Sequence, residues 1–197
     1  DGVNPVTQDI TVTVTNVNDI APVFTSEATF SAAENQTDIG TVTATDADGD
    51  SLIFSSTFDA EDIQINSTTG VLTFTTAPDY EPVNTTYGGG VFVSDGFHTM
   101  QQKITVNVTN VNDNSPIITS EATFSAEENQ TTIGTVAATD ADGDTIAYSV
   151  SGTDSGSVSI NSSTGVLTFN SAPNYESKTS YSIVVTASDG TNSTTQN

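Results

Sequence analysis

The chain contains two copies of one sequence, and this internal repeat limits its fold more than any other feature. Residues 30–37 (FSAAENQT) return as residues 124–131 (FSAEENQT), and residues 46–50 (DADGD) return unchanged as residues 140–144. The copies are offset by 94 residues at these positions, a length that suits one β-sandwich domain. The 197 residues therefore correspond to about two such domains.

The two ends of the sequence are interpreted from the same repeat. An alternating Ile-Thr-Val pattern that includes Ile10, Val12 and Val14 precedes residues 16–19 (NVND), and the same pattern precedes residues 110–113. We therefore interpret 1–19 as the last strand and linker of a preceding repeat, 20–112 as a complete repeat, and 113–197 as a second repeat lacking its last strand.

This division predicts an exposed sheet edge in the second repeat and an unpartnered strand over residues 8–18. Exchange of that strand between molecules would satisfy both, because a free sheet edge accepts an added strand. The alternative is a second repeat that folds with a frayed edge. The sequence leaves these two outcomes open.

Short alternating segments separated by Gly, Asn, Asp and Pro predict β-strands throughout. Thr and Val dominate these segments, and β-branched side chains favour a pleated, half-buried surface. We expect strands near 28–32, 40–45, 51–56, 63–65, 71–75, 89–94 and 99–109, with equivalents in the second copy as far as about 187. Seven strands per copy predict an all-β fold of tandem Greek-key β-sandwiches of immunoglobulin type.

The composition limits the classes of molecule that this chain can bind. With 2 Lys and Arg against 25 Asp and Glu, the formal charge is -23, which excludes ordinary binding to nucleic acid or to an anionic membrane. The longest apolar runs are a few residues long, so no direct membrane insertion is expected. The absence of Cys and the single His exclude disulfides, zinc clusters and a nucleophile with its base. The chain is therefore interpreted as non-enzymatic, with cations as partners.

The connector between the copies, residues 110–116 (NVNDNSP), is built largely from groups that offer oxygen ligands. Calcium takes six to eight oxygen ligands, so this composition favours a calcium site over a flexible linker. Residues 46–50 begin like an EF-hand loop, but Ser51 and Thr57 replace the Gly and the bidentate Glu that such a loop requires. A plain turn is the alternative for this motif alone.

The motifs together resemble the cadherin repeat, and specifically the cadherin-like tandem repeats of bacterial surface and adhesin proteins. That family carries xEx, DxD, DRE, xDx and DxNDN motifs in this order. Residues 33–35 (AEN), 46–48 (DAD), 78–81 (PDYE), 94–96 (SDG) and 110–114 (NVNDN) stand in these places. The resemblance covers essentially the whole chain. It departs from the family at Asn16, Asn110, Ile20, Tyr80 and Asn174.

The resemblance implies that calcium binds at the junction between repeats, as the one cofactor of the chain. The ligands implied there are Glu34, Asp79, Glu81, Asn112, Asp113, Asn114, Asp140, Asp142 and Asp189. A partial second site is implied at Asn18, Asp19, Asp46, Asp48 and Asp95. So many converging carboxylates would repel one another without a cation.

The expected function is that of an extracellular, cell-surface fragment in which calcium stiffens the repeats into a spacer for cell adhesion. Its partners would be calcium, neighbouring repeats of the same protein, and either a polysaccharide or another copy of itself. The alternatives are a calcium-dependent carbohydrate-binding module and direct homophilic adhesion. A glycosidase pair at Asp79 and Glu81 is rejected, because the two acids lie on one extended segment with no cleft around them.

Overall fold

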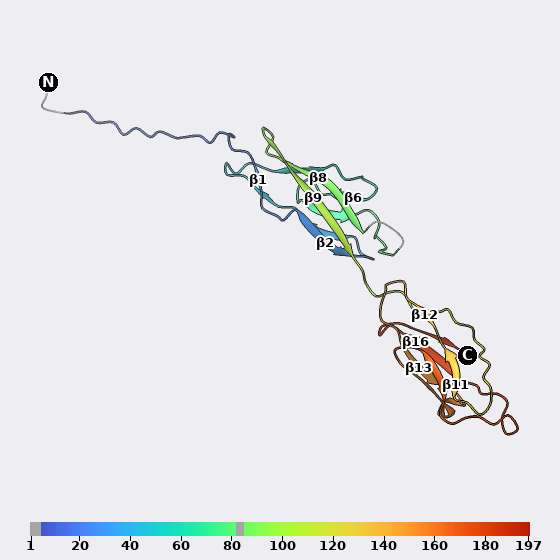
Figure 1. Ribbon diagram of the computed structural model, residues 1–197. Coiled ribbons are helices and arrows are strands. Elements are labelled where there is room, and N and C mark those ends of the chain that lie inside the picture. The colour runs from blue at the N-terminus through green and yellow to red at the C-terminus, as the bar shows by residue number, and fades with distance from the viewer. Residues whose placement is uncertain (1–4, 82–84) are drawn as a thin grey trace. The chain divides into compact units, whose positions relative to one another are not determined.

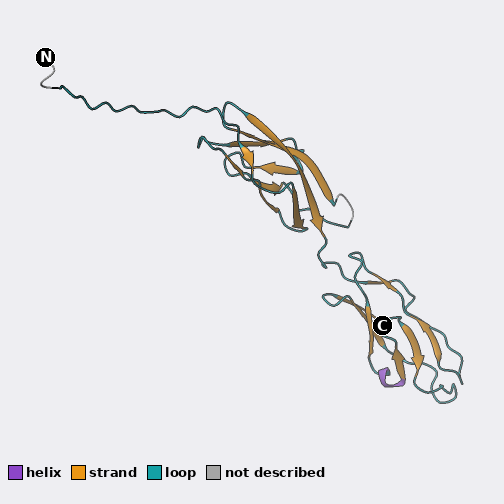
Figure 2. Cartoon of the chain, turned by 60° about the vertical axis from the view of Figure 1, so that its left-hand side comes forward, coloured by secondary structure: helices purple, strands orange, loops and turns teal. Residues whose placement is uncertain are grey.

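The computed structural model describes residues 5–81 and 85–197. The chain divides into two compact units, unit 1 (Asp1–Thr109) and unit 2 (Asn110–Asn197), each built from short strands joined by loops (Figures 1 and 2). The part of the chain that the structure describes has no α-helix and only one short 3₁₀ segment, η1 (Ser155–Ser157). It also has no helix with the length and hydropathy needed to cross a membrane.

Unit 1 is a sandwich of two main sheets. Its strands are β1 (Val23–Phe24), β2 (Thr29–Ala33), β3 (Asp38–Thr41), β4 (Ala44–Thr45), β5 (Ile53–Ser56), β6 (Ile63–Ile65), β7 (Val71–Phe74), β8 (Thr86–Ser94) and β9 (Thr99–Thr109). One sheet has the order β2-β9-β8-β5, the other β3-β7-β6, and β1 pairs with β4. Strand β9 is central, because it pairs in parallel with β2 and antiparallel with β8.

The core of unit 1 depends on the alternation along β9. Ile104, Val106 and Val108 are at most 4% exposed, while Thr105 and Asn107 between them stay partly exposed. A strand points successive side chains to opposite faces, so this alternation buries one face and leaves the other to solvent. The inward side chains belong to the core cluster that also contains Leu72 of the opposite sheet. The two sheets therefore share one apolar interior.

Unit 2 repeats this order with shorter strands. They are β10 (Ile117–Ile118), β11 (Thr132–Thr135), β12 (Ala138–Thr139), β13 (Ala147–Ser151), β14 (Val158–Ile160), β15 (Val166–Phe169), β16 (Val184–Ser188) and β17 (Ser193–Gln196). The sheets have the orders β11-β15-β14 and β13-β16-β17, and β10 pairs with β12. The equivalent of β2 is missing from the second of these sheets. Both units are thus all-β sandwiches, the class that the sequence predicts.

Three details differ from the sequence prediction. The single strand expected at 40–45 is divided into β3 and β4, which join different sheets. The sequence predicts a second copy without its last strand, yet Ser193–Gln196 form β17 and pair with β16. Residues 123–127 form no strand although they match β2 at four of five positions, because the parallel partner that β2 finds in residues 105–109 has no counterpart in unit 2.

Residues 5–19 form an extended segment without a strand ladder (Figure 1). Ile10, Val12 and Val14 are 78%, 80% and 90% exposed, although they match the buried side chains of β9. The first four residues of the predicted segment 1–19 lie outside the described residues. The side chains of an alternating apolar segment stay exposed unless the segment pairs with a sheet.

Candidate metal centres

An acidic turn closes one end of unit 1, which we call its base. The carboxylate of Asp46 accepts hydrogen bonds through Oδ1 from the backbone N–H groups of Asp48 (2.9 Å) and Asp50 (3.2 Å). This is the local bonding that makes Asp a turn residue, and Gly49 follows with a φ of +82° that suits glycine. The turn brings one carboxylate oxygen from each of Asp46, Asp48 and Asp50 within 4.8 Å of the other two.

The linker of unit 1, residues 16–20, is fixed to this turn by hydrogen bonds. Oδ2 of Asp48 accepts from the N–H groups of Asp19 (3.1 Å) and Ile20 (2.8 Å). The Asn16 amide donates to the backbone oxygen of Asp48 at 2.7 Å. Asp48 therefore holds the linker by its side chain and its backbone, and the oxygens of residues 16–20 lie beside the acidic turn.

Asp95 supplies a further carboxylate at the base of unit 1. Its Oδ1 accepts from the N–H groups of Phe97 (2.7 Å) and His98 (2.5 Å), and its Oδ2 lies 3.1 Å from Nδ1 of His98. Its backbone oxygen accepts from the Asn18 amide at 3.2 Å. Burial raises the pKa of Asp95, but the hydrogen bonds from His98 and Phe97 outweigh it and hold the pKa below its usual value.

The base of unit 2 has the same construction. Oδ2 of Asp142 accepts from the N–H groups of Asp113 (3.1 Å) and Asn114 (2.9 Å), and the Asn110 amide donates to its backbone oxygen at 2.8 Å. One carboxylate oxygen from each of Asp140, Asp142 and Asp144 lies within 4.8 Å of the other two. The same arrangement therefore occurs twice, once in each unit.

Two side chains distinguish the base of unit 2. Asn114, which replaces Ile20, donates from its amide to Oδ1 of Asp142 at 3.1 Å. Asn192, which replaces His98, donates to Oδ1 of Asn112 at 3.2 Å instead of bonding the carboxylate of Asp189. Oδ1 of Asp189 accepts from two backbone N–H groups, whereas its Oδ2 has no donor.

Buried oxygens without a donor are the best evidence that these bases fit a cation. In unit 1 they are Oδ1 of Asn18 and Oδ2 of Asp46 and Asp50, and in unit 2 they are Oδ2 of Asp140 and Asp189. A buried carboxylate oxygen that accepts no hydrogen bond is costly, so such atoms indicate a missing partner. Hard oxygen ligands from Asp and Asn are those that calcium takes. The donor set therefore fits calcium.

The charges in each acidic turn also shift the pKa of its third aspartate. Burial first, and then the neighbouring charges of Asp46, Asp48 and Asp95, raise the pKa of Asp50. Burial and the neighbouring carboxylates raise the pKa of Asp144 in the same way. A cation in the turn would reverse this preference, because it favours the ionised form.

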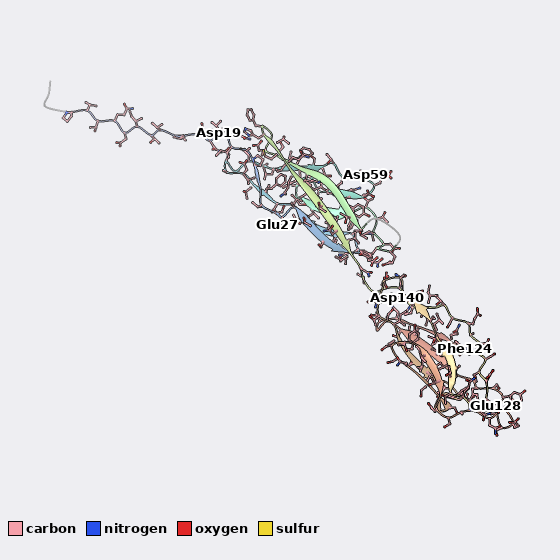
Figure 3. All side chains as sticks on the ribbon, viewed as in Figure 1. Asp19, Glu27, Asp59, Phe124, Glu128 and Asp140 are labelled. Carbon is pink, nitrogen blue, oxygen red and sulfur yellow. The ribbon has the colours of Figure 1, made fainter. Side chains whose placement is uncertain are left out.

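Each unit carries a second acidic group away from its base. Figure 3 shows Asp140 and Glu128 at opposite ends of unit 2. In unit 1, Oε2 of Glu34 accepts from the N–H of Tyr80 at 2.6 Å, and Oδ1 of Asp79 accepts from the N–H of Glu81 at 3.4 Å. The residue after Glu34 is Asn35 in a left-handed conformation (φ 61°), which Asn tolerates better than most side chains.

In unit 2 the same loops lack one charge. Oε2 of Glu128 accepts from the N–H of Tyr175 at 3.0 Å, as its counterpart does in unit 1. Asn174 replaces Asp79 and accepts from the N–H of Glu176 at 2.9 Å. The loop geometry is kept with an amide oxygen, whereas the negative charge at that position is lost.

The structure groups the predicted ligands as follows. Asn18, Asp19, Asp46, Asp48 and Asp95 lie together at the base of unit 1, and Asn112, Asp113, Asn114, Asp140, Asp142 and Asp189 lie together at the base of unit 2. Glu34, Asp79 and Glu81 belong to other loops of unit 1. Sequence reasoning omitted Asp50 and Asp144 from the ligands. It also missed Asn16, Asn110, His98 and Asn192, whose roles depend on contacts far apart in the sequence.

Comparison with known proteins finds relatives of this chain. Residues 122–197 match the family model of the cadherin domain. This match supports a cadherin domain in unit 2. Human Protocadherin Fat 4 is 39% identical over 136 residues, which cover 62% of this chain and 3% of that protein. The chain thus spans a small part of this relative's length.

Solved cadherin structures share the fold. The human Desmocollin-1 ectodomain is 26% identical with a TM-score of 0.72, over 88% of this chain and 38% of that one. Human Protocadherin-24 EC1-2 is 24% identical with a TM-score of 0.70, over 90% and 92%. The chain shares the extracellular, cell-surface location of such ectodomains, as the sequence predicted. These cadherin relatives are animal proteins, so they do not support the narrower resemblance to bacterial adhesin repeats.

Proposed function

We propose that this chain is a calcium-binding, non-enzymatic part of a cell-adhesion protein, and that calcium stiffens its repeats into a spacer. The observation that carries the proposal is the pair of matching bases, each with a linker hydrogen-bonded to an acidic turn and with buried carboxylate oxygens that lack a donor. The support from known proteins is the match to the cadherin domain.

The stiffening follows from where the bases lie in the sequence. Strand β9 ends at Thr109, and the linker that follows it begins at residue 110. Asp142 binds the N–H groups of residues 113 and 114 of this linker. A cation bound by Asp140, Asp142 and Asp189 would draw the oxygens of Asn112 and Asp113 toward the turn and restrict rotation of the linker. We further propose that Glu34, Asp79 and Glu81 supply ligands to the same ions, which would tie unit 1 to this linker.

The expected affinity follows from the class of site. Extracellular calcium modules bind at about 10⁻⁴–10⁻³ M, so occupancy would depend on millimolar calcium outside the cell. Binding to the folded state alone would stabilise it by about 2.7 kcal/mol at a calcium concentration of 100 times the dissociation constant. Calcium would therefore control both the stiffness and the stability of the spacer.

The proposal is tested by calorimetric titration with calcium and by thermal unfolding of the wild type, Asp142→Asn and Asp38→Asn. The first substitution keeps an oxygen that accepts the N–H groups of Asp113 and Asn114 but removes the charge, so calcium binding should weaken markedly. Asp38 is an exposed residue of β3, and Asp38→Asn makes the same chemical change away from either base. Equal binding by the two variants, or no binding by the wild type at millimolar calcium, would refute the proposal.

Carbohydrate binding has less support in the structure. A row of exposed aromatic rings on one sheet face would favour it, and within residues 5–81 and 85–197 the strongly exposed aromatic side chains are Phe97 in unit 1 and Tyr175 in unit 2. One ring in each unit does not make such a row. Direct homophilic adhesion stays an alternative for the whole protein, and it too would use a calcium-stiffened spacer.

A further inference from the structure

The motif Asn-X-Ser/Thr, in which X is not proline, occurs at seven asparagines of the chain. These are Asn35, Asn66, Asn84, Asn107, Asn129, Asn161 and Asn192, of which Asn84 lies outside the described residues. In an extracellular protein this motif is an acceptor for an oligosaccharide on the asparagine amide. The motif alone does not distinguish the seven, so the choice depends on what each amide does in the fold.

Asn66 lies in the exposed turn that joins β6 to β7. Its Oδ1 accepts the backbone N–H groups of Thr68 and Thr69, both at 3.0 Å. Its own N–H donates to the backbone oxygen of Val71 (2.8 Å), and the N–H of Gly70 donates to its backbone oxygen (2.9 Å). All four bonds lie within residues 66–71, so this turn is a local structure of the kind that Asn side chains favour.

Unit 2 repeats this turn between β14 and β15. Oδ1 of Asn161 accepts the N–H groups of Ser163 and Thr164, both at 3.0 Å, and Asn161 is exposed. In both turns the third residue of the motif donates its N–H to the asparagine side chain. A backbone N–H can bond only to the oxygen of that amide, so these bonds also identify which atom is Nδ2. The amide is thus held through its oxygen.

The fold makes no use of the amide nitrogens of Asn66 and Asn161. Within residues 5–81 and 85–197, neither Nδ2 donates a hydrogen bond, and both side chains face solvent. Asn192 differs, because its Nδ2 donates to Oδ1 of Asn112 (3.2 Å) and to the backbone oxygen of Asn114 (3.4 Å). An oligosaccharide on Asn192 would therefore disturb the base of unit 2, whereas one on the two turns would displace nothing.

The remaining described motifs depend on contacts far apart in the sequence. Asn107 lies within β9, and its Oδ1 accepts the hydroxyl of Thr86 at 3.2 Å. The motifs at Asn35 and Asn129 end in threonines whose backbone oxygens accept N–H groups from β7 and β15. A turn made of adjacent residues can form before these distant contacts do. The motifs in the two turns can therefore present their amides early in folding.

We propose that Asn66 and Asn161 are sites of N-linked glycosylation. In this reaction a transferase joins Nδ2 to the anomeric carbon of an oligosaccharide carried on a lipid diphosphate. The carbon–nitrogen bond forms, the bond from the anomeric carbon to the phosphate oxygen breaks, the lipid diphosphate leaves, and the amide loses one proton to a base of the transferase. The two N–H groups on Oδ1 assist, because they stabilise the negative charge that develops on the amide oxygen as that proton leaves.

The first test is secretion of the chain from animal cells, followed by mass spectrometry of its peptides. The peptides are compared before and after an amidase that releases N-linked oligosaccharides and leaves Asp in place of each modified Asn. Asn66 and Asn161 should carry an oligosaccharide and be converted, and Asn192 should not. The same chain produced in the bacterial cytosol gives the unmodified masses.

The second test uses two neighbouring threonines of the turn in unit 1. Thr68→Ala keeps Asn66 and the backbone N–H on its Oδ1 but removes the hydroxyl that the motif requires, so modification of Asn66 should be lost. Thr69→Ala is the matched control, because the N–H of Thr69 also binds Oδ1 while its hydroxyl lies outside the motif. Modification of Asn66 should persist there. Asn161 in the same molecules reports that each variant has passed through the secretory pathway.

Ser163→Ala and Thr164→Ala form the same pair in unit 2, with Asn66 as the internal reference. A secreted chain with unmodified Asn66 and Asn161, or one modified only at Asn107 or Asn192, would overturn the proposal. Modification of Asn66 that survives Thr68→Ala would also overturn it. These outcomes are separate from calcium binding, which is measured on the unmodified chain.

Discussion

The two units have nearly the same sequence at their bases but different structures in the opposite half of the sandwich. Both bases show the same hydrogen bonds from linker to turn, with Asp48 and Asp142 as acceptors. Among the described residues, however, thirteen hydrophobic side chains form the buried core of unit 1, and only five are buried in unit 2. The hydrogen bonds of the base are therefore kept in both units, whereas the extent of the buried core differs between them.

The largest expected effect tests the central role of β9. Ile104→Ala should destabilise unit 1 by about 2–5 kcal/mol, because it removes buried methyl groups and leaves a cavity. Ile10→Ala makes the same change at the equivalent repeat position, where the side chain is 78% exposed, and should change stability by less than about 0.5 kcal/mol. Urea unfolding of both variants measures the difference. Similar losses would show that β9 does not have the central role inferred here.

The next effect tests a turn that the two units share. Gly70 and Gly165 have φ values of +71° and +69°, and an added Cβ would lie 2.2 Å and 2.1 Å from the backbone oxygens of Val42 and Val136. Alanine at either position should cost at least about 1–3 kcal/mol, the strain of a left-handed residue, with the clash added. The losses should be similar, because the two glycines have the same backbone conformation and the same close contact.

The control for this pair is Gly88→Ala. Its added Cβ would meet nothing within 4 Å, so the loss should be smaller than at either turn. Thermal unfolding followed by calorimetry resolves the changes. A cost at Gly165 far below that at Gly70 would mean that the shared turn is less rigid in unit 2.

Much of this architecture can be predicted from short-range patterns. The alternation of Ile104, Val106 and Val108 predicts β9 and its buried face, and Asp-Ala-Asp-Gly-Asp predicts an acidic turn. Residues 123–127 show the limit of such reasoning, because they match β2 at four of five positions yet form no strand. The strand state of β2 depends on a partner 76 residues away in the sequence, which no local pattern contains.

The candidate sites show the same limit. The carboxylates can be predicted from their motifs, but the contacts of Asn16 with Asp48 and of Asn192 with Asn112 link residues 32 and 80 positions apart. Only the fold reveals that His98 bonds Asp95 while its counterpart Asn192 leaves Oδ2 of Asp189 without a donor. Differences between nearly identical bases therefore come from residues outside the acidic motifs.

A smaller effect concerns the like charges of the turn in unit 1. Burial and neighbouring carboxylates raise the pKa of Asp50, so its contribution to folding is favourable below the unfolded pKa near 3.8 and is lost as the pH rises through the folded pKa. In calcium-free buffer at neutral pH, Asp50→Asn should therefore melt above the wild type, and the difference should vanish in acid. With calcium present the order should reverse, because the variant has lost a ligand. Asp38→Asn should show neither change, and an Asp50→Asn variant that melts below the wild type without calcium would contradict the repulsion.

The smallest effect has the opposite dependence on pH and belongs to unit 2. The carboxylate of Asp154 pairs with Lys178 and accepts the N–H of Ser182 at 2.7 Å, and these bonds, that of Lys178 first, lower its pKa. Its contribution to stability is therefore present above the unfolded pKa near 3.8 and is lost as the pH falls through the folded pKa. Asp154→Asn should melt slightly below the wild type at neutral pH and equal it in strong acid, and added salt should shrink the difference because the pair is exposed. Melting curves of Asp50→Asn and Asp154→Asn against pH should therefore diverge from the wild type in opposite directions. If both variants melted on the same side of the wild type, the carboxylates of the acidic turn would not repel one another. The electrostatic argument for a cation in that turn would then fail.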